Sequence, residues 1–263
     1  MDRTDAKSIR RQATENPVGI DFDAVAAGLS TSDAVVRADL TAAFSAVAGT
    51  DPDRVGQYLD ELTDCLDDDT PEVRTNATHT FGSVAKSDPA AVAHYLDALV
   101  PALADSTAAV RRNATFAFGE VAKTDPGKVA SYVEGLGRCL GDANDAVRTN
   151  AAFVFRRVAA ADPAAVATRL GTLAEHLGDS NATVRRNLTL AFAAVADEDP
   201  ERVEHYLARI ESRLSDDNDR VQAAAAAVVR AIEGTDDQPT DTKIYRPDSP
   251  MSQHTSGDGS DTP

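Results

Sequence analysis

A period of 37 residues runs through the chain and constrains its fold more than any single motif. The dipeptide Val110-Arg111 recurs at this interval on both sides, and Val221-Gln222 completes the series. Asp-Pro follows the same interval from Asp51-Pro52 to Asp199-Pro200, after a looser Asn16-Pro17. Self-similarity at such an interval predicts a repeat architecture, in which each unit packs on its neighbours and no single central core is needed.

Each period contains the start signals of two helices. Aspartate followed by proline favours a helix start, because aspartate accepts from free N–H groups and proline lacks an N–H that would go unpaired. A second start lies three residues before each Val-Arg, where the chain has Asp, Thr or Asn. The eighth residue after the valine is phenylalanine in five units and is predicted to be core: Phe44, Phe81, Phe118, Phe155 and Phe192. We therefore predict an all-α solenoid.

The period, the Asp-Pro and Val-Arg dipeptides, and an aspartate six residues before each arginine together resemble the HEAT repeat family. The resemblance implies about six two-helix units and a polar ladder of aspartate and arginine between them. The matching residues are Asp68, Arg74, Asp105, Arg111, Asp142, Arg148, Asp179 and Arg185. Thr31 and Gln222 depart from the pattern in the first and last units, so we expect the ladder to stop at both ends.

The repeat boundaries divide the chain into three parts. We predict an N-terminal capping segment at 1–15, a solenoid at 16–235 and an acidic tail at 236–263 that is disordered, because Asp, Thr, Ser, Pro and Gly dominate it. The predicted units are 16–50, 51–87, 88–124, 125–161, 162–198 and 199–235. Lys243–Pro247 is a basic and apolar cluster within the tail, and is either a docking motif or an unselected piece of it.

The net charge of −17 comes from 32 Asp and 11 Glu against 21 Arg and only 5 Lys. Such a surface repels itself in dilute buffer, whereas at about 1 M salt the screening length shrinks to roughly 3 Å. We therefore hypothesise a halophilic source. The sequence shows no secretory signal and no apolar run long enough for a membrane span, which leads us to expect a cytoplasmic protein.

No arrangement of residues suggests catalysis. The five histidines fall in different units or in the tail, without a recognisable metal-ligand spacing, and no glycine-rich phosphate loop or serine elbow is present. Cys65 and Cys139 occupy the same repeat position two units apart, beyond the reach of a disulfide. We expect a protein that is not an enzyme and that holds no metal or cofactor.

The candidate binding residues lie on the Val-Arg helices, which line the concave face in HEAT proteins. A 100° step per residue puts the second, sixth and ninth residues after the valine opposite the buried stripe. In the middle units these positions include Arg112, Phe116, Phe153, Arg156, Arg186 and Leu190. Arginines and aromatics dominate binding hot spots, but the apolar residues could equally fill gaps between adjacent helices. Asn76, Asn113, Asn150 and Asn187 flank them and are interpreted as hydrogen bonders between units.

The function predicted from these features is a scaffold or adaptor that binds a protein segment with acidic and apolar residues. An alternative is a chromosome- or nucleic-acid-associated regulator, which high salt disfavours because phosphate contacts weaken steeply with salt. A third is an enzyme like the chromophore lyases with HEAT-like repeats, which would reveal itself by a bound pigment.

Overall fold

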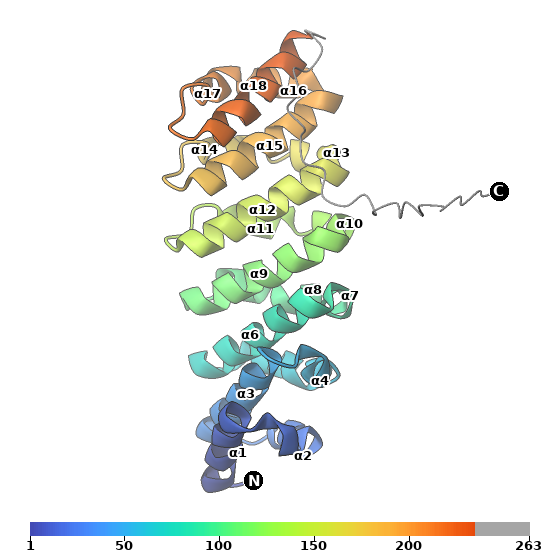
Figure 1. Cartoon of the computed structure of the whole chain (residues 1–263), viewed down its shortest axis with the longest axis vertical. Coiled ribbons are helices and arrows are strands. Elements are labelled where there is room, and N and C mark those ends of the chain that lie inside the picture. Colours follow the sequence, from blue (N-terminus) through green and yellow to red (C-terminus); the bar gives the residue numbers. More distant parts are fainter. Residues whose placement is uncertain (235–263) are drawn as a thin grey trace, which may run out of the picture.

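The structure is a computed structural model in which residues 1–234 are described; the predicted tail, with its Lys243–Pro247 cluster, lies outside the described residues. Those residues form helices and no strand, stacked in two layers along one axis (Figure 1). One layer holds the long helices, α3 (Ala34–Ala48), α6 (Pro71–Ser87), α9 (Ala108–Thr124), α12 (Asp145–Ala161), α15 (Ala182–Glu198) and α18 (Asp219–Glu233). From α6 onward these helices begin at intervals of 37 residues, as the period requires.

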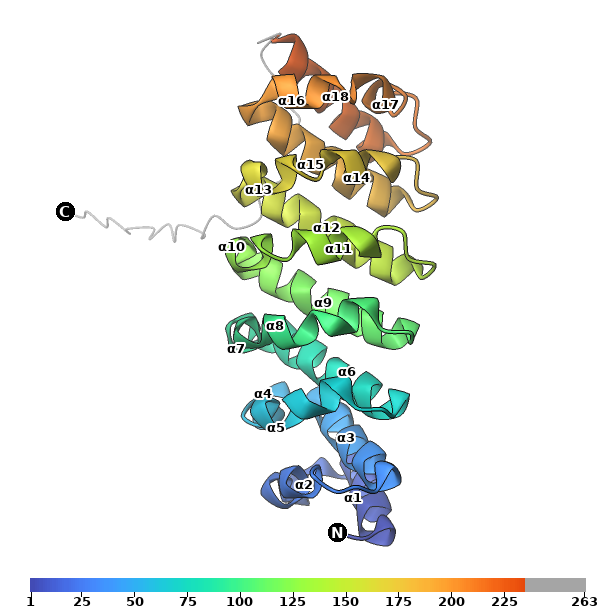
Figure 2. The same ribbon diagram turned by 180° about the vertical axis from the view of Figure 1, so that it is seen from behind.

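The other layer holds shorter helices and is seen from behind in Figure 2. It comprises α2 (Phe22–Gly28), α4 (Pro52–Gly56), α5 (Leu59–Thr63), α7 (Pro89–Val92), α8 (Leu96–Leu99), α10 (Pro126–Ala130), α11 (Val133–Cys139), α13 (Pro163–Ala167), α14 (Leu170–Glu175), α16 (Pro200–Glu204) and α17 (Leu207–Glu211). Short 3-10 segments η1 (Pro17–Gly19), η2 (Asp64–Asp67), η3 (Ala93–Tyr95) and η4 (Pro101–Ala104) supplement them.

The expected Asp-Pro helix is therefore divided in two in each unit from the second onward. The break falls at one repeat position, held by Tyr58, Tyr95, Tyr132, Arg169 and Tyr206. At Tyr95 the backbone φ is −109° and ψ is 10°, outside the α-helical region. The tyrosine ring packs edge-on against the core phenylalanine of the preceding unit, with the Phe81 and Tyr95 centroids 5.5 Å apart. This local geometry is not encoded in apolar spacing, which is the same for a straight helix.

The helices start at the predicted cap residues, but Asp51, Thr70 and Thr107 make no side-chain cap. Asn144 and Asn181 accept hydrogen bonds from the first-turn N–H groups of α12 and α15, and Asp125 does the same for α10. Thr107 makes no side-chain cap; instead its own N–H donates to Asp105 Oδ1 at 2.6 Å. A ladder aspartate thus fixes the start of the long helix.

The core lies between the two layers and continues through all units. The five phenylalanines at the predicted core position are completely buried: Phe44, Phe81, Phe118, Phe155 and Phe192. Both cysteines are free and buried, and burial is the main cause that raises the pKa of the Cys65 thiol to about 12 and that of Cys139 to about 11. They behave as small core residues rather than as reactive thiols.

Candidate partner-binding surface

A ladder of arginine and aspartate fixes each long helix against the next unit. Arg111 donates from Nε to Asp142 Oδ2 at 2.5 Å and from Nη2 to Asp142 Oδ1 at 3.0 Å, while its Nη1 donates to the main-chain oxygen of Asp105. Each ladder arginine therefore holds the carboxylate of the following unit and the backbone of its own. The same pattern joins Arg74 to Asp105, Arg148 to Asp179 and Arg185 to Asp216.

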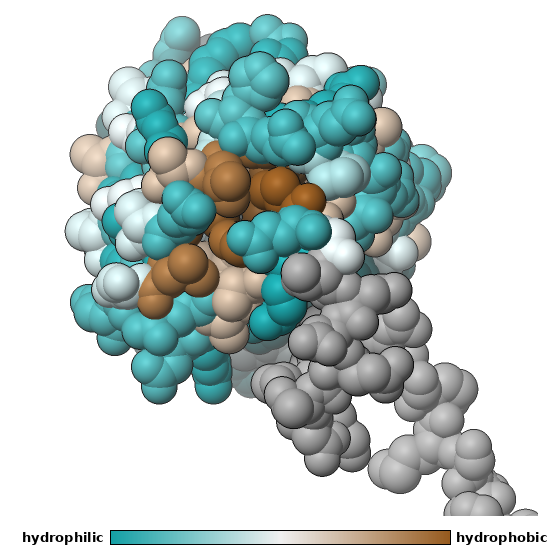
Figure 3. Space-filling view, turned by 90° about the horizontal axis from the view of Figure 1, so that it is seen from above, coloured by the Kyte–Doolittle hydropathy of each residue, from teal (hydrophilic) through white to brown (hydrophobic). Residues whose placement is uncertain are grey.

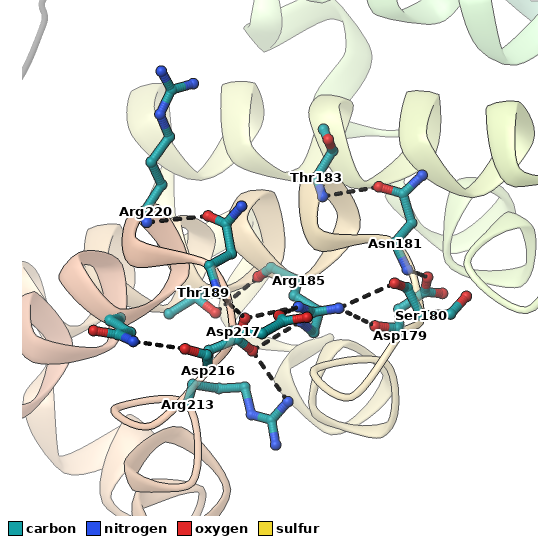
Figure 4. A network of polar contacts seen from close by, with 12 residues as sticks. Asp179, Ser180, Asn181, Thr183, Arg185, Thr189, Arg213, Asp216, Asp217 and Arg220 are labelled. Atoms are coloured by element: carbon teal, nitrogen blue, oxygen red, sulfur yellow. Dashed lines mark hydrogen bonds and ion pairs between the residues drawn. The ribbon is translucent and has the colours of Figure 1, made fainter.

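The ladder includes one more residue at each end than the HEAT-like pattern predicts: Arg37 at the start and Asp216 at the end. Arg37 donates to Asp68 at 2.6 Å although Thr31 precedes it, because the main-chain oxygen of Thr31 serves as well as that of an aspartate. At the other end Asp216 accepts from Arg185, and Gln222 keeps only the bond to the main-chain oxygen of Asp216. Figure 4 shows this last rung, where Arg213 and Asp217 also join the network.

Asparagines connect adjacent long helices directly. Asn113 Nδ2 donates to the main-chain oxygen of Thr75 at 3.3 Å and lies 3.4 Å from Thr78 Oγ1. Asn76 and Asn150 make the equivalent pair of bonds to the long helix of the unit before them. Asn187 is buried at the same position, but Ala152 stands where the other units have the accepting threonine. Asn76, Asn113 and Asn150 therefore play the predicted role between units, whereas Asn187 makes no such bond among the described residues.

The six candidate residues project from three consecutive long helices, α9, α12 and α15, and we call them the arginine–aromatic row. They are Arg112, Phe116, Phe153, Arg156, Arg186 and Leu190. Arg112 is exposed and the other five are half-buried. The ladder and the asparagines hold the three helices in register, so the row has a fixed geometry.

Each aromatic ring of the row rests on a glycine of the preceding helix. Phe116 Cδ1 lies 3.2 Å from where a Cβ on Gly82 would stand, and Phe153 Cδ1 lies 3.7 Å from the same point on Gly119. The rings therefore fill the space that a side chain at the glycine would take, yet remain partly open to solvent. His79 holds the equivalent position on α6, with its Nδ1 2.9 Å from Ser45 Oγ.

Arg156 is the most constrained cation of the row. Its Cζ lies 5.1 Å from the centroid of the Phe153 ring, a cation–π arrangement, and its Nε is buried without a hydrogen-bond partner in the described part of the chain. Burial, followed by the nearby charges of Arg157 and Arg186, lowers the pKa of this guanidinium. An arginine remains charged nonetheless, so a partly buried positive charge stands here uncompensated.

No acidic residue among residues 1–234 pairs with Arg112, Arg156 or Arg186. Arg112 donates only to the neighbouring Asn113 Oδ1, and burial together with its charge lowers the pKa of His79. The buried carboxylate of α9, Glu120, is already neutralised by Lys123 at 2.6 Å. The row can thus offer guanidinium donors to a carboxylate beside apolar surface.

Clusters that could bind a metal and helices that could span a membrane are both absent from residues 1–234. Within the described residues no group of three or more His, Cys, Asp or Glu side chains could hold a metal ion. No helix in that part of the chain is long and apolar enough to cross a bilayer.

A second ladder, of tyrosine and aspartate in the layer of shorter helices, was not predicted from the sequence. Tyr95 Oη donates to Asp60 Oδ1 at 2.8 Å, and Tyr58–Asp23 and Tyr132–Asp97 repeat this pair. Burial, then the hydrogen bond to Asp60, raises the pKa of Tyr95 to about 12. Both members recur every 37 residues in the sequence, so the signal was available in the periodicity of the polar residues.

Two family profiles match parts of the chain. The profile of GCN1-like, C-terminal HEAT repeats matches residues 50–160, and that of the non-SMC mitotic condensation complex subunit 1 matches residues 126–203. No curated protein matches the chain.

Designed repeat proteins are similar in three dimensions. One structure, of computationally designed armadillo repeat proteins for modular peptide recognition, has a TM-score of 0.71 at 22% identity, covering 80% of this chain and 99% of that one. A second designed armadillo repeat protein has a TM-score of 0.67 at 22% identity, covering 81% and 100%. Together with the ladder and the period, these similarities identify the chain as a HEAT-like α-solenoid.

Proposed function

We propose that the protein is a non-enzymatic scaffold or adaptor that binds a segment of another protein along the arginine–aromatic row. The observation that carries the proposal is the contrast between two kinds of arginine. The ladder arginines are each paired with a carboxylate, whereas Arg112, Arg156 and Arg186 have no acidic partner among the described residues. In a chain with a net charge of −17, carboxylates to pair with them are abundant.

The proposed ligand has acidic and apolar residues. Phe116, Phe153 and Leu190 supply half-exposed apolar surface, and a carboxylate reaching Arg156 or Arg186 would accept charge-assisted hydrogen bonds. Apolar contact is retained at high salt, under which we propose the protein works, while pure charge attraction is screened. The peptide recognition named for the designed armadillo proteins supports a protein ligand of this kind.

The experiment is a selection from a random peptide library displayed on phage, carried out in 2 M KCl and again in ~0.1 M KCl. The proposal expects enriched peptides that combine Asp or Glu with large apolar residues. Peptides without acidic residues, or no enrichment at either salt, would count against it.

A second candidate is a chromosome- or nucleic-acid-associated regulator. The match of residues 126–203 to the condensation complex subunit supports it, since this range contains Phe153, Arg156, Arg186 and Leu190. Bare DNA that binds with an affinity falling steeply with salt would favour it, because each phosphate contact contributes a slope of about −0.9 on a log–log plot.

A further inference from the structure

The two ends of the solenoid are finished differently. At the N-terminal end the amphipathic helix α1 (Arg3–Glu15) packs along α3. Ala6 and Ala13 of α1 face the core, and most of its other residues are polar and exposed. Repeat arrays need such an end with a polar outer surface, because an open end exposes the apolar surface that neighbouring units cover elsewhere.

The C-terminal end has no comparable cover among the described residues. Leu214 is 40% exposed, although its equivalents Leu66, Leu103, Leu140 and Leu177 are at most 6% exposed. Leu207, Val229 and Ile232 are likewise half-buried at positions whose equivalents are buried in units two to five. We call these four residues the C-terminal end face. Figure 3 looks down on this end and shows apolar residues gathered within a hydrophilic rim.

The polar ladder ends at this unit without an unpaired arginine. Gln222 replaces the ladder arginine that would need an aspartate from a further unit, and donates to the main-chain oxygen of Asp216 at 2.6 Å. The polar residues of this unit are therefore suited to the last position of the array, because they need no aspartate from a further unit. Its apolar positions are still occupied by large apolar residues, with Val229 in place of the internal phenylalanine.

Two apolar residues and one aspartate beyond Gly234 fall in the repeat register. Ile244 stands 37 residues after Leu207, Met251 stands 37 residues after Leu214, and Asp236 stands 37 residues after Asp199. Prolines at 239, 247 and 250 disfavour a full helix there. We propose that residues 236–251 of the same chain cover the C-terminal end face, with Ile244, Tyr245 and Met251 as the buried contacts.

Chain connectivity and charge favour this occupant over a second copy. Gly234 ends α18 in a left-handed conformation, with φ 63°, and the ten residues to Ile244 can span up to about 36 Å, more than the roughly 20 Å across two packed helices. A tethered segment is also present at millimolar effective concentration. Lys243 and Arg246 flank Ile244-Tyr245, while residues 1–234 carry 37 acidic against 24 basic side chains. Two whole chains would repel each other in dilute buffer.

Tryptophan fluorescence tests the proposal cleanly, because the chain has no tryptophan. The full-length Tyr245→Trp protein is measured at 2 M KCl, where the screening length is about 2 Å. Because the proposal buries this residue, we expect blue-shifted tryptophan emission and weak quenching by acrylamide. Adding Ile244→Asp and Met251→Asp, which alter only the tail segment, should shift the emission to the red and raise the quenching constant several-fold. Ser256→Asp, further along the tail, should change neither.

The end face is tested from the other side with Leu214→Asp in the Tyr245→Trp background. The same red shift is expected, with far-UV circular dichroism verifying that the solenoid is folded; Val18→Asp, at an exposed residue of the opposite end, is the matched control. Solvent-exposed emission in the unmodified tail would overturn the proposal. Blue-shifted emission that vanishes on dilution, together with a doubled mass in sedimentation, would overturn it in favour of a second copy.

Discussion

The guanidinium of Arg156 lies over the ring of Phe153, three residues before it on α12, with 5.1 Å between Cζ and the ring centroid. The ring holds the cation in place but does not neutralise it, and nearby Arg157 and Arg186 add repulsion. The unbound protein therefore carries an electrostatic cost on this surface. A ligand carboxylate would offset that cost, which is the physical basis of the proposed binding site.

Two arginine substitutions separate a binding role from a structural one. Arg156→Met should leave the free energy of unfolding unchanged or raise it by up to ~1 kcal/mol, because it removes an unpaired, partly buried charge. Arg111→Met should lower it by about 3–5 kcal/mol, because it leaves the Asp142 carboxylate, 8% exposed, without its partner. Urea denaturation measures both. Equal destabilisation by the two substitutions would show that Arg156 is structural.

Two phenylalanines of α9 provide a second comparison. Phe118 is fully buried, so Phe118→Ala should cost about 3–5 kcal/mol in the free energy of unfolding. Phe116 rests on Gly82 and is only half-buried, so Phe116→Ala should cost less than about half as much. Thermal and urea denaturation give both values. Comparable costs would mean that Phe116 belongs to the core, as the gap-filling interpretation requires.

The ladder makes stability depend on pH at the acidic end. The hydrogen bonds from Arg111 lower the pKa of Asp142 in the folded state, outweighing burial, which raises it. A lowered folded pKa gives stabilisation that is fully present above the unfolded value of about 3.9 and is lost as pH falls through the folded value. The Asp142→Asn variant should therefore lose less stability than the wild type between pH 5 and pH 2, a range that brackets the unfolded aspartate pKa of about 3.9. The midpoints of urea denaturation at each pH measure this loss. Asp64→Asn, at an exposed residue, should follow the wild type.

The tyrosine ladder makes stability depend on pH at the alkaline end. Burial and the bond to Asp60 raise the pKa of Tyr95 to about 12. Its stabilisation is fully present below the unfolded value of about 10 and is lost as pH rises through the folded value. Tyr95→Phe should cost about 1 kcal/mol or less at neutral pH and should flatten the loss of stability in alkali. An absorbance titration of the wild type in which every tyrosine ionises with a pKa near 10 would contradict this.

Periodicity and capping chemistry predict much of this fold because each unit repeats the same local signals. Asn144 and Asn181 mark the starts of their helices, and Phe118 marks the core, since these roles depend on nearby sequence alone. The break at Tyr95 was not predicted, because apolar spacing does not distinguish a straight helix from a divided one.

The candidate surface is harder to read from sequence for a related reason. The exposure of Phe116 depends on how closely α9 approaches Gly82 on α6, which is a distance between units and not a local signal. The lack of an acidic partner for Arg156 likewise depends on which carboxylates the packing brings near, and Glu120 is already paired with Lys123.

The most direct test of the binding site is a calorimetric titration with an acidic–apolar peptide obtained from the phage-display selection. The peptide is titrated into the Phe116→Asp/Phe153→Asp double variant at 2 M KCl, where charge screening is nearly complete. Val100→Asp, at an exposed residue of the other layer, is the matched control. Our account predicts at least tenfold weaker binding, about 1.4 kcal/mol, by the double variant with its helical circular dichroism retained, and unchanged binding by the control. Undiminished affinity in a folded double variant, or loss of the fold itself, would contradict it.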